Sequence, residues 1–377
     1  MGFSSPNPPV ACVITDTRDN ILVGAHTQRT GGNHAEREAY SKFSNDRPHK
    51  LYVTLEPCNH FGRTPPCLDL ILEKKPLEVI IGNPDPNPIL KSRNTIEELE
   101  QQGIRASYSD EIRSISYPYL SGFLTRIQKN RPVFLMKAAL SKDGYYCNTN
   151  KDKIALSNPH SNAISQFIRS KIDAIVVGPG TVFGDNPSLD FRSYLPIDSF
   201  EIDFGREFFF SSILTTLRNG IENDFPHKQP DRVFLISSSK FPDSTFFEKQ
   251  RAIATQGNEK IIFLVLDRIS EARESLLKLT TDFPLIFMKE NIQNSLLEIA
   301  SLRLWNFVLI EGGNSLYSSI SSIFNQNDLL IQIHTQKELN DGIEMDLNQK
   351  YLREKEVSFF IDDDYWEVFR YSNKIIN

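Results

Sequence analysis

The sequence contains little cysteine and no excess of basic residues. Four cysteines occur among 377 residues, and 42 lysines and arginines stand against 48 aspartates and glutamates, for a net charge of -6. So few cysteines do not make the disulfide framework of a small secreted protein, which favours a reducing, cytoplasmic setting. A protein that holds long nucleic acid usually shows a basic surface, so the acidic balance argues against a nucleic-acid partner.

Long apolar segments are also missing. No uncharged apolar run reaches the roughly 18 residues of a membrane span, and the first residues, MGFSSPNPPVACVITD, lack the basic start and apolar core of a signal peptide. We therefore expect no membrane partner. The chain does have 40% hydrophobic and 24% charged residues, with 26 phenylalanines and 12 tyrosines, a globular mixture long enough for two domains.

Strand and helix patterns alternate along the chain in two series. The first predicts strands at residues 10–15, 21–26, 51–55, 78–82 and 104–108, with helices in HAEREAYSKF and NTIEELEQQG. The second begins at PVFLMKAALS and continues through DAIVVG, RVFLIS, KIIFLVL, PLIFM, NFVLIEGG and LLIQIH. This alternation predicts an α/β protein with largely parallel sheets. We expect a first domain over residues 1–120, a linker over 121–131 and a second domain over 132–377, while residues 192–231 follow no clear pattern.

His34, Cys58 and Cys67 fall in an order that suggests a metal site. His34 opens the tripeptide HAE, and the two cysteines lie in PCNHFGRTPPC. Imidazole and thiolate ligands together suit zinc, and three protein ligands leave a fourth position for water, as in catalytic zinc sites. Zinc lowers the pKa of a bound water to about 7. Glu36, at the start of an expected helix, is placed to move protons as the general base and acid.

Two other interpretations of these residues stay open. The cysteines could be small apolar core residues, as we expect for Cys12 and Cys147. Alternatively, a closed structural zinc site could recruit His60 as its fourth ligand and make the domain a zinc-stapled binding module. Metal content does not distinguish such a module from an enzyme, whereas turnover of a free aminopyrimidine nucleotide does.

The motifs of the first domain resemble those of a known family. HAE followed by a PC and a later cysteine is the signature of the cytidine-deaminase-like superfamily, which uses zinc on cytosine or adenine rings. The elements PNPPVACVI, HAEREAY, TLEPCNHFGRTPPC and NPDPNP, in this order, resemble the deaminase half of the bifunctional riboflavin biosynthesis deaminase/reductase family. The GRTPPC element is the most particular, because other superfamily members usually place the second cysteine three residues after the first. The resemblance implies a three-layer domain that holds one Zn²⁺.

In that family the substrate is 2,5-diamino-6-(5-phosphoribosylamino)pyrimidin-4-one. The resemblance places Asn7 near the ribose and the pyrimidine, and His60 and Arg63 near the sugar phosphate. A guanidinium forks well onto phosphate, which agrees with that role for Arg63. The family carries a helix before the PNP element, and we expect this helix to be missing here because the sequence starts almost at PNP.

Four later elements, MKAALSKDG, VVGPGT, GDNPSLDFR and LIEGGNSLY, resemble the reductase half of the same family, which has a dihydrofolate-reductase-like α/β fold. Glycines after a strand let the backbone approach a ligand, and a strand–glycine–helix junction can offer N–H donors to a cofactor phosphate. The resemblance implies that NADPH is bound by Thr181, Asp185, Gly312, Gly313, Asn314 and Ser315. It also implies that the phosphoribosyl substrate is bound by Arg169, Leu189, Arg192 and Glu311.

The chain departs from the family pattern in three segments. ALSN at residues 155–158 stands where a tryptophan-containing segment is usual, TQKELNDG stands for a glycine-bearing segment, and KSRN at residues 91–94 replaces a GRG element. We expect a bifunctional, homo-oligomeric enzyme that deaminates its pyrimidine and then reduces the ribosyl group to ribityl with NADPH. The alternatives are a deaminase with a degenerate reductase domain and a nucleic-acid base deaminase.

Overall fold

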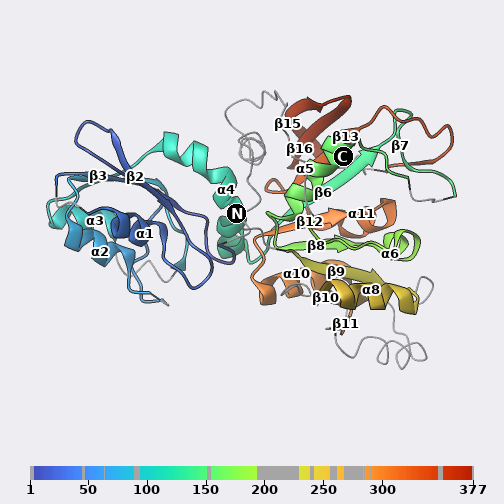
Figure 1. Ribbon diagram of the computed structural model, residues 1–377, viewed down its shortest axis with the longest axis horizontal. Coiled ribbons are helices and arrows are strands. Elements are labelled where there is room, and N and C mark those ends of the chain that lie inside the picture. Colours follow the sequence, from blue (N-terminus) through green and yellow to red (C-terminus); the bar gives the residue numbers. More distant parts are fainter. Residues whose placement is uncertain are drawn as a thin grey trace. The chain divides into compact units, whose positions relative to one another are not determined.

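The computed structural model describes residues 4–44, 47–62, 64–88, 94–150, 154–192, 229–237, 242–254, 261–266, 283, 285–288, 291–346 and 351–375. The chain divides into two compact units, Met1–Arg131 and Pro132–Asn377. Each unit has its own sheet with helices packed against it (Figure 1). The α/β class expected from the alternation of strands and helices is therefore confirmed. In the described part of the chain, no helix is long and apolar enough to cross a membrane.

The sheet of the first unit has five strands in the order β2-β1-β3-β4-β5. They are β1 (Ala11–Thr15), β2 (Ile21–His26), β3 (Lys50–Leu55), β4 (Glu78–Asn83) and β5 (Arg105–Tyr108). β1 pairs antiparallel with β2 and β3, whereas β3, β4 and β5 run parallel. The carboxyl ends of the three parallel strands therefore meet at one edge, where α/β proteins commonly place functional side chains.

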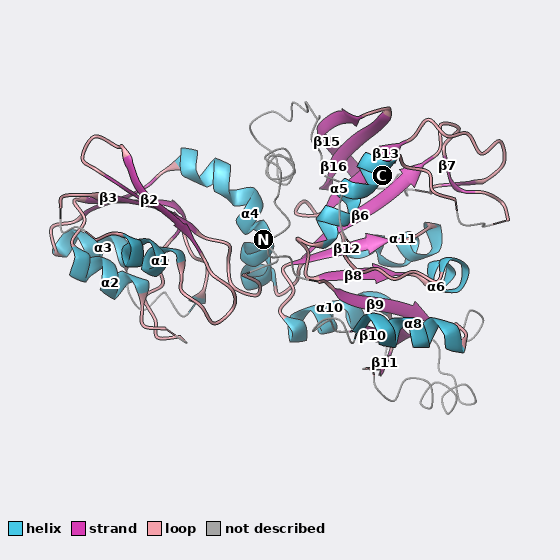
Figure 2. Ribbon diagram, in the orientation of Figure 1, coloured by secondary structure: helices cyan, strands magenta, loops and turns pink. Residues whose placement is uncertain are grey.

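Helices cover both faces of this sheet. They are α1 (Ala35–Lys42), α2 (Cys67–Lys74), α3 (Thr95–Gln101) and α4 (Asp110–Lys129). Figure 2 shows α1 and α2 on one side of the sheet and α4 on the other. A Cβ at Gly82 of β4 would lie 2.7 Å from Ile112 and 2.8 Å from the carbonyl oxygen of Thr54, so glycine is what lets α4 approach this strand.

The segment expected as a linker is mostly helical. Residues 121–129 form the second half of α4, which begins with the Ser109 hydroxyl accepting a hydrogen bond from the Ile112 N–H. Pro118 lies inside the helix, and this residue normally interrupts one. Burial of Leu120, Phe123 and Leu124 in the core of the first unit outweighs that local preference. Residues 121–129 are therefore part of the first unit rather than a connector.

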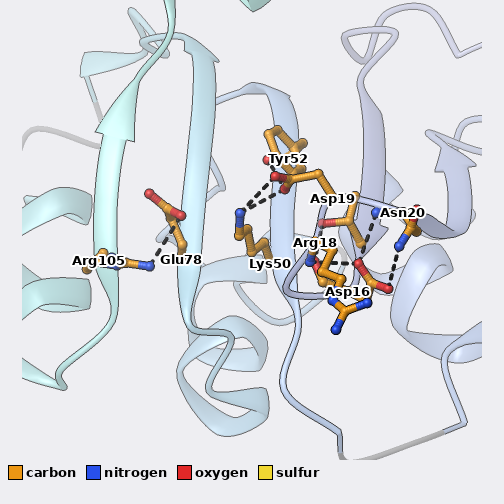
Figure 3. A network of polar contacts seen from close by, with 9 residues as sticks. Asp16, Arg18, Asp19, Asn20, Lys50, Tyr52, Glu78 and Arg105 are labelled. Carbon is orange, nitrogen blue, oxygen red and sulfur yellow. Dashed lines mark hydrogen bonds and ion pairs between the residues drawn. The ribbon is translucent and has the colours of Figure 1, made fainter.

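A polar network ties together the opposite edge of the same sheet (Figure 3). Asp19, in the turn between β1 and β2, accepts hydrogen bonds from Lys50 Nζ at 2.8 Å and from the Tyr52 hydroxyl at 2.7 Å. Further along this edge, Arg105 pairs with Glu78 at 3.5 Å. These residues lie at or near the amino ends of the parallel strands. The network is therefore at the end of the sheet opposite to Cys58, which follows the carboxyl end of β3.

The second unit contains a nine-stranded sheet in the order β11-β10-β9-β8-β12-β6-β13-β16-β15. Its strands are β6 (Val133–Leu140), β8 (Ala174–Val177), β9 (Asp231–Ile236), β10 (Ile261–Val265), β11 (Leu285–Phe287), β12 (Phe307–Glu311), β13 (Leu329–His334), β15 (Tyr351–Ile361) and β16 (Asp364–Ile375). The seven strands from β11 to β13 are parallel, whereas β15 and β16 are antiparallel. β8 and β10 are buried throughout, as expected for parallel strands covered on both faces.

Helices pack against both faces of this sheet as well. They are α5 (Pro159–Arg169), α6 (Pro179–Asp185), α8 (Ser244–Ala254), α10 (Ile292–Arg303) and α11 (Asn314–Ile320). Leu296 of α10 and Tyr317 of α11 share a core cluster with Val233 and Leu235 of β9. Phe234, between those two strand residues, faces the other way and packs edge-on against Phe246 of α8 at 5.1 Å. Alternate side chains of β9 therefore pack into the cores on the two opposite faces of the sheet.

The C-terminal hairpin of β15 and β16 was not anticipated from the sequence. It extends the parallel part of the sheet, because β16 pairs with β13. A second small sheet joins β7 (Tyr145–Cys147) to β14 (Ile343–Glu344). Residues 193–228, most of the stretch without a clear sequence pattern, lie outside the described residues.

Candidate functional site

Three loop and helix boundaries bring His34, Cys58 and Cys67 together. His34 is the residue that precedes α1, and Cys67 is the first residue of α2. Cys58 lies in the loop that leaves the carboxyl end of β3. Both helices begin at this point, so the positive ends of two helix dipoles lie near the sulfur atoms.

The donor atoms of these three residues lie within 4.8 Å of one another. His34 Nδ1 is 3.5 Å from Cys58 Sγ and 3.5 Å from Cys67 Sγ. The backbone N–H of Cys67 donates to Cys58 Sγ at 3.3 Å. Among the described residues, this is the group of potential ligands close enough to hold a metal ion, and His60 does not belong to it.

The pKa values of the two thiols are shifted in opposite directions. Hydrogen bonds with Cys67 and then with His34 lower the pKa of the Cys58 thiol. The hydrogen bond with Cys58, followed by burial, raises the pKa of the Cys67 thiol. A single imidazole cannot stabilise two adjacent thiolates, whereas a divalent cation can. The donor set of one nitrogen and two sulfurs therefore fits zinc, and it leaves one tetrahedral position for a non-protein ligand.

Glu36 is a buried carboxylate beside this cluster. It lies in the first turn of α1, is 4% exposed, and its carboxylate accepts a hydrogen bond from the Cys67 thiol. Burial first, and then the Cys58 thiolate, raise the pKa of Glu36 to about 7. Such a buried acid is unusual in a structural core, and its position next to the metal-binding atoms is the one a proton-transfer group needs.

Of the three residues expected to contact the substrate in the first unit, Asn7 and His60 are described. His60 is half-buried in the loop after Cys58, and its Nδ1 is buried without a hydrogen-bond partner. Asn7 lies in an N-terminal turn where its N–H donates to the Ser4 carbonyl at 2.9 Å, and Thr30 Oγ1 anchors that turn by donating to the Ser5 carbonyl at 2.8 Å. Arg63 lies outside the described residues.

Two acidic residues near His60 were not singled out from the sequence. The Asp85 N–H donates to Glu56 Oε2 at 3.2 Å, and the Tyr108 hydroxyl donates to the same oxygen at 3.0 Å. Burial raises the pKa of Asp85 to about 6. Asp85 follows β4 and Glu56 follows β3, so adjacent parallel strands deliver both to one edge. That topological signal could have identified them in TLEPC and NPDPNP.

In the second unit, Arg169 and Glu311 form a buried ion pair. Arg169 Nη2 lies 2.7 Å from Glu311 Oε2, and Lys137 Nζ lies 3.6 Å from Glu311 Oε1. The side chain of Arg169 is 12% exposed, that of Glu311 is 15% exposed and that of Lys137 is 16% exposed. Burial favours the neutral acid, but the two cations outweigh it and hold the pKa of Glu311 at about 2. Lys137 was missed, although it is the one charged residue in the apolar strand VFLMKAAL.

The glycine junction after β12 is tightly packed. A Cβ at Gly313 would lie 2.7 Å from the hydroxyl and ring of Tyr146, and one at Gly312 would lie 3.1 Å from Leu316. The backbone N–H of Asn314 donates to the Tyr146 hydroxyl. The Asn314 side chain donates to the Glu344 carbonyl at 2.8 Å and accepts from the Asp346 N–H at 2.7 Å. Asn314 therefore braces β14, whereas Ser315 is exposed.

The remaining expected residues lie on or after α6. Thr181 and Asp185 belong to this helix and are half-buried. Leu189 is 3% exposed with a φ of 61°, and the exposed Arg192 pairs with Asp190 at 3.5 Å. The atypical ALSN segment ends at Asn158, which caps α5 by accepting from the Ser161 N–H. Of KSRN, only Asn94 is described, and it caps α3.

Two family models match the chain. The cytidine and deoxycytidylate deaminase zinc-binding region matches residues 2–83. The RibD C-terminal domain matches residues 132–326, which is more than half of the chain. The first match contains the His34, Cys58 and Cys67 cluster, and the second contains the Arg169–Glu311 pair.

Curated relatives of the chain from several bacteria share one description, riboflavin biosynthesis protein RibD. The riboflavin biosynthesis protein RibD of Actinobacillus pleuropneumoniae is 37% identical over 199 residues, which is 51% of this chain and 50% of that protein. That of Haemophilus influenzae is 28% identical over 340 residues, covering 88% of this chain and 80% of that protein. The match to the Actinobacillus relative, like most of the curated matches, spans about half of the relative's length.

Solved structures of two similar proteins share the fold along nearly the whole chain. A diaminohydroxyphosphoribosylaminopyrimidine deaminase/5-amino-6-(5-phosphoribosylamino)uracil reductase from Thermotoga maritima superposes with a TM-score of 0.74 at 24% identity, covering 98% of this chain and 94% of that one. RibD of Acinetobacter baumannii gives a TM-score of 0.75 at 22% identity with the same coverage. The expected fold, a deaminase-like domain followed by a reductase-like domain, is thereby confirmed. From the extent of the second family match, together with the zinc-binding region that precedes it, the chain belongs to the RibD family.

Proposed function

We propose that the chain catalyses two successive steps of riboflavin biosynthesis. The first unit would remove an exocyclic amine from 2,5-diamino-6-(5-phosphoribosylamino)pyrimidin-4-one by hydrolysis, and the second would reduce the ribosyl group to a ribityl chain with NADPH. The observation that carries the proposal is the cluster of His34, Cys58 and Cys67 with the buried Glu36 beside it. Membership of the RibD family supports both steps.

In the proposed deamination, His34 Nδ1 and the sulfur atoms of Cys58 and Cys67 hold one Zn²⁺ per chain. Zinc held there supplies an activated water at neutral pH. Glu36 would take one proton from this water and pass it to the ring nitrogen, and would then pass the second proton of the same water to the departing amine, for which its raised pKa is well matched. The C–N bond breaks, a C=O bond forms, and ammonia leaves.

The phosphoribosyl group is the part of the substrate that a small free pyrimidine lacks. We assign its recognition to Asn7, His60 and Arg63. The support from geometry is the buried Nδ1 of His60, which has no hydrogen-bond partner and lies in the loop that follows Cys58. Imidazole and guanidinium groups are suitable donors to phosphate oxygens.

In the proposed reduction, hydride is transferred to the sugar and the ribose ring opens. We assign substrate binding to Arg169, Leu189, Arg192 and Glu311. The NADPH site is assigned to Thr181, Asp185, Gly312, Gly313, Asn314 and Ser315. The ionised Glu311, held by Arg169 and Lys137, can orient Arg169 toward a phosphate or accept hydrogen bonds from sugar hydroxyls.

We further propose that the enzyme is a cytoplasmic homo-oligomer that acts on a free nucleotide rather than on nucleic acid or at a membrane. None of the four cysteines, all of which are among the described residues, forms a disulfide bond. A zinc site that uses two thiolates is preserved by a reducing compartment, because oxidation would remove its ligands.

One experiment tests the two steps together. Purified chain is incubated with the diaminopyrimidinone ribotide, with and without NADPH, and the products are identified by mass. Deamination alone without NADPH, followed by a gain of two hydrogens when NADPH is added, supports the proposal. Deamination in both samples with no reduction would leave a deaminase with a degenerate second unit. Neither product from zinc-loaded protein would refute the proposed function.

A further inference from the structure

The segment that follows α6 adopts an uncommon backbone conformation. Asn186 has a φ of 43° and Leu189 a φ of 61°, so two non-glycine residues within four positions lie in the left-handed region. Such residues are disfavoured locally and persist when the surrounding structure holds them. We refer to residues 186–191 as the α6 loop. It carries Leu189 and leads directly to Arg192, two of the residues assigned above to the substrate.

Side chains from a distant part of the sequence hold the α6 loop through its backbone. Gln250 Nε2 donates to the Pro187 carbonyl at 2.9 Å, and Arg232 Nη1 donates to the Ser188 carbonyl at 2.9 Å. Gln229 pairs with both backbone groups of Phe191, accepting from its N–H and donating to its carbonyl, each at 2.7 Å. We call Arg232, Gln250 and Gln229 the loop clamp.

Two members of the loop clamp are fully buried. Arg232 and Gln250 are each 0% exposed, and Arg232 Nη1 also donates to Gln250 Oε1 at 2.9 Å. A buried guanidinium such as that of Arg232 in β9 is unfavourable compared with an apolar residue of similar volume. Here the hydrogen bonds of Arg232 Nη1 go to the α6 loop and to Gln250, which holds the same loop, so this buried charge contributes to fixing the loop backbone.

The α6 loop is also connected to the Arg169–Glu311 pair. In the amide orientation that satisfies both of its neighbours, Gln166 donates to the Asp190 carbonyl at 3.2 Å and accepts from Arg169 Nη1 at 3.2 Å. Arg169 in turn donates to Glu311. A continuous series of hydrogen bonds and backbone therefore runs from the loop clamp, through residues 188–190, to the two charged residues assigned to the substrate.

We propose that Arg232, Gln250 and Gln229 are positioning residues for substrate binding in the second unit. We assign them no contact with substrate or cofactor. They fix the backbone of the α6 loop so that Leu189, Arg192 and the Arg169–Glu311 pair present one preformed surface to the phosphoribosyl group. This inference rests on the proposed reductase function and adds to it the residues that set the affinity for the ribotide. Preformed sites bind more tightly because less conformational entropy is lost on binding.

The test uses substitutions that remove one hydrogen bond at a time in the full-length, zinc-loaded chain. Gln250→Glu keeps the acceptor for Arg232 and loses the donor to Pro187. Gln229→Glu likewise keeps the acceptor for the Phe191 N–H and loses the donor to its carbonyl. The matched control is Gln336→Ala, because the exposed Gln336 also donates to a backbone carbonyl, that of Asp363 at 3.1 Å, away from the α6 loop.

Reduction of 5-amino-6-(5-phosphoribosylamino)uracil is followed through NADPH absorbance, and binding of the ribotide is measured by calorimetry. We expect both clamp variants to raise KM and Kd for the ribotide by about tenfold, with a smaller change in kcat and in KM for NADPH. Gln336→Ala should leave all of these constants unchanged. Melting followed by fluorescence of Trp305 and Trp366, both in the second unit, shows whether each variant is folded.

The outcomes separate this inference from the proposed function. Folded clamp variants with wild-type KM and Kd for the ribotide would overturn the inference while leaving the reductase function intact. Equal losses in ribotide and NADPH affinity would also overturn it, because they would reflect general loosening of the unit. If the wild-type chain binds the ribotide without reducing it, the proposed reduction fails. The Kd of the clamp variants for the ribotide, compared with that of the wild type, then still tests the positioning role of the loop clamp. If the wild-type chain does not bind the ribotide, both fail.

Discussion

Arg169 Nη2 donates to Glu311 Oε2 at 2.7 Å in a pair that is largely shielded from water. Burial alone disfavours ionised Glu311, yet the neighbouring Arg169 and Lys137 lower its pKa from 4.5 to about 2. This pair joins the carboxyl end of β12 to the end of α5. It is therefore both a structural element of the second unit and part of its candidate substrate surface.

The depressed pKa of Glu311 predicts a loss of stability in acid. The ionised carboxylate stabilises the folded state fully above a pH of about 4.5, and this contribution disappears as the pH falls toward 2. A shift of this size corresponds to about 3 kcal/mol of unfolding free energy. Removal of one cation in Arg169→Met should raise the pKa of Glu311 and move acid unfolding to higher pH. Both tryptophans lie in the second unit, so their fluorescence reports its acid titration.

Glu311→Gln provides the complementary measurement. It removes the titrating group, so the unfolding free energy of the second unit should depend less steeply on pH between about 4.5 and 2 than in the wild type. Glu248→Gln, which changes an exposed carboxylate on α8, is the control and should keep the wild-type profile. An unchanged acid profile in both Arg169→Met and Glu311→Gln would contradict the assigned pKa.

Zinc content provides the second prediction. His34→Ala, Cys58→Ala and Cys67→Ala should each reduce bound zinc from about one per chain to a small fraction, because each leaves only two protein ligands. Cys147→Ala is the matched control, since this cysteine lies in β7 of the second unit and its replacement should leave zinc occupancy full. Metal is quantified by mass spectrometry after dialysis against a weak chelator. Full zinc content in Cys67→Ala would exclude the three-ligand site.

The third prediction separates proton transfer from metal binding. Glu36→Gln preserves the shape of the side chain but cannot act as a base, so deamination should fall by roughly 10²–10⁴-fold while zinc content stays the same. Glu38→Gln tests specificity, because Glu38 lies on the same helix and pairs with Lys42 at 3.0 Å. It should deaminate at nearly the wild-type rate. Comparable rates for Glu36→Gln and the wild type, at equal zinc content, would exclude Glu36 from proton transfer.

The proximity of His34, Cys58 and Cys67 could be predicted because the sequence signals that bring them together are local. Each ligand lies at the start of a helix or just after a strand, and the motifs HAE and PCNHFGRTPPC place these boundaries in sequence. The parallel strands of both sheets were predicted for the same reason, since buried parallel strands such as β8 and β10 are continuous apolar runs. Gly103, expected at the end of α3, has the φ of 76° that suits this position.

Other features depended on contacts that the sequence does not express locally. Residues 121–131 were expected to be a linker, whereas residues 121–129 belong to α4, which is stabilised by the burial of Leu120, Phe123 and Leu124. The hairpin of β15 and β16 alternates polar and apolar residues around its turn, but its value to the fold lies in pairing with β13, a relationship between strands distant in sequence. The loop clamp could not be predicted for the same reason, since its hydrogen bonds to the α6 loop join residues 38 or more positions apart.

The last prediction concerns the independence of the two activities. A Cβ at Gly313 would lie 2.7 Å from the Tyr146 ring and hydroxyl, so Gly313→Val must displace Tyr146 or the junction that follows β12. We expect NADPH binding, measured by quenching of tryptophan fluorescence, to weaken by on the order of tenfold or more, and NADPH oxidation to fall with it. Asp185→Ala should act in the same direction.

Zinc content and deamination should stay within about twofold of the wild type in the Gly313→Val chain, because the zinc cluster belongs to the first unit. A second substitution identifies the cause of the loss. If the collision with Tyr146 displaces the junction, then Tyr146→Ala creates the missing space, and the double variant of Gly313→Ala with Tyr146→Ala should bind NADPH more tightly than Gly313→Ala alone. If the double variant shows only the sum of two separate losses, the side chain added at position 313 acts directly on the cofactor rather than through Tyr146. A parallel fall in deamination for Gly313→Val would contradict two separable sites.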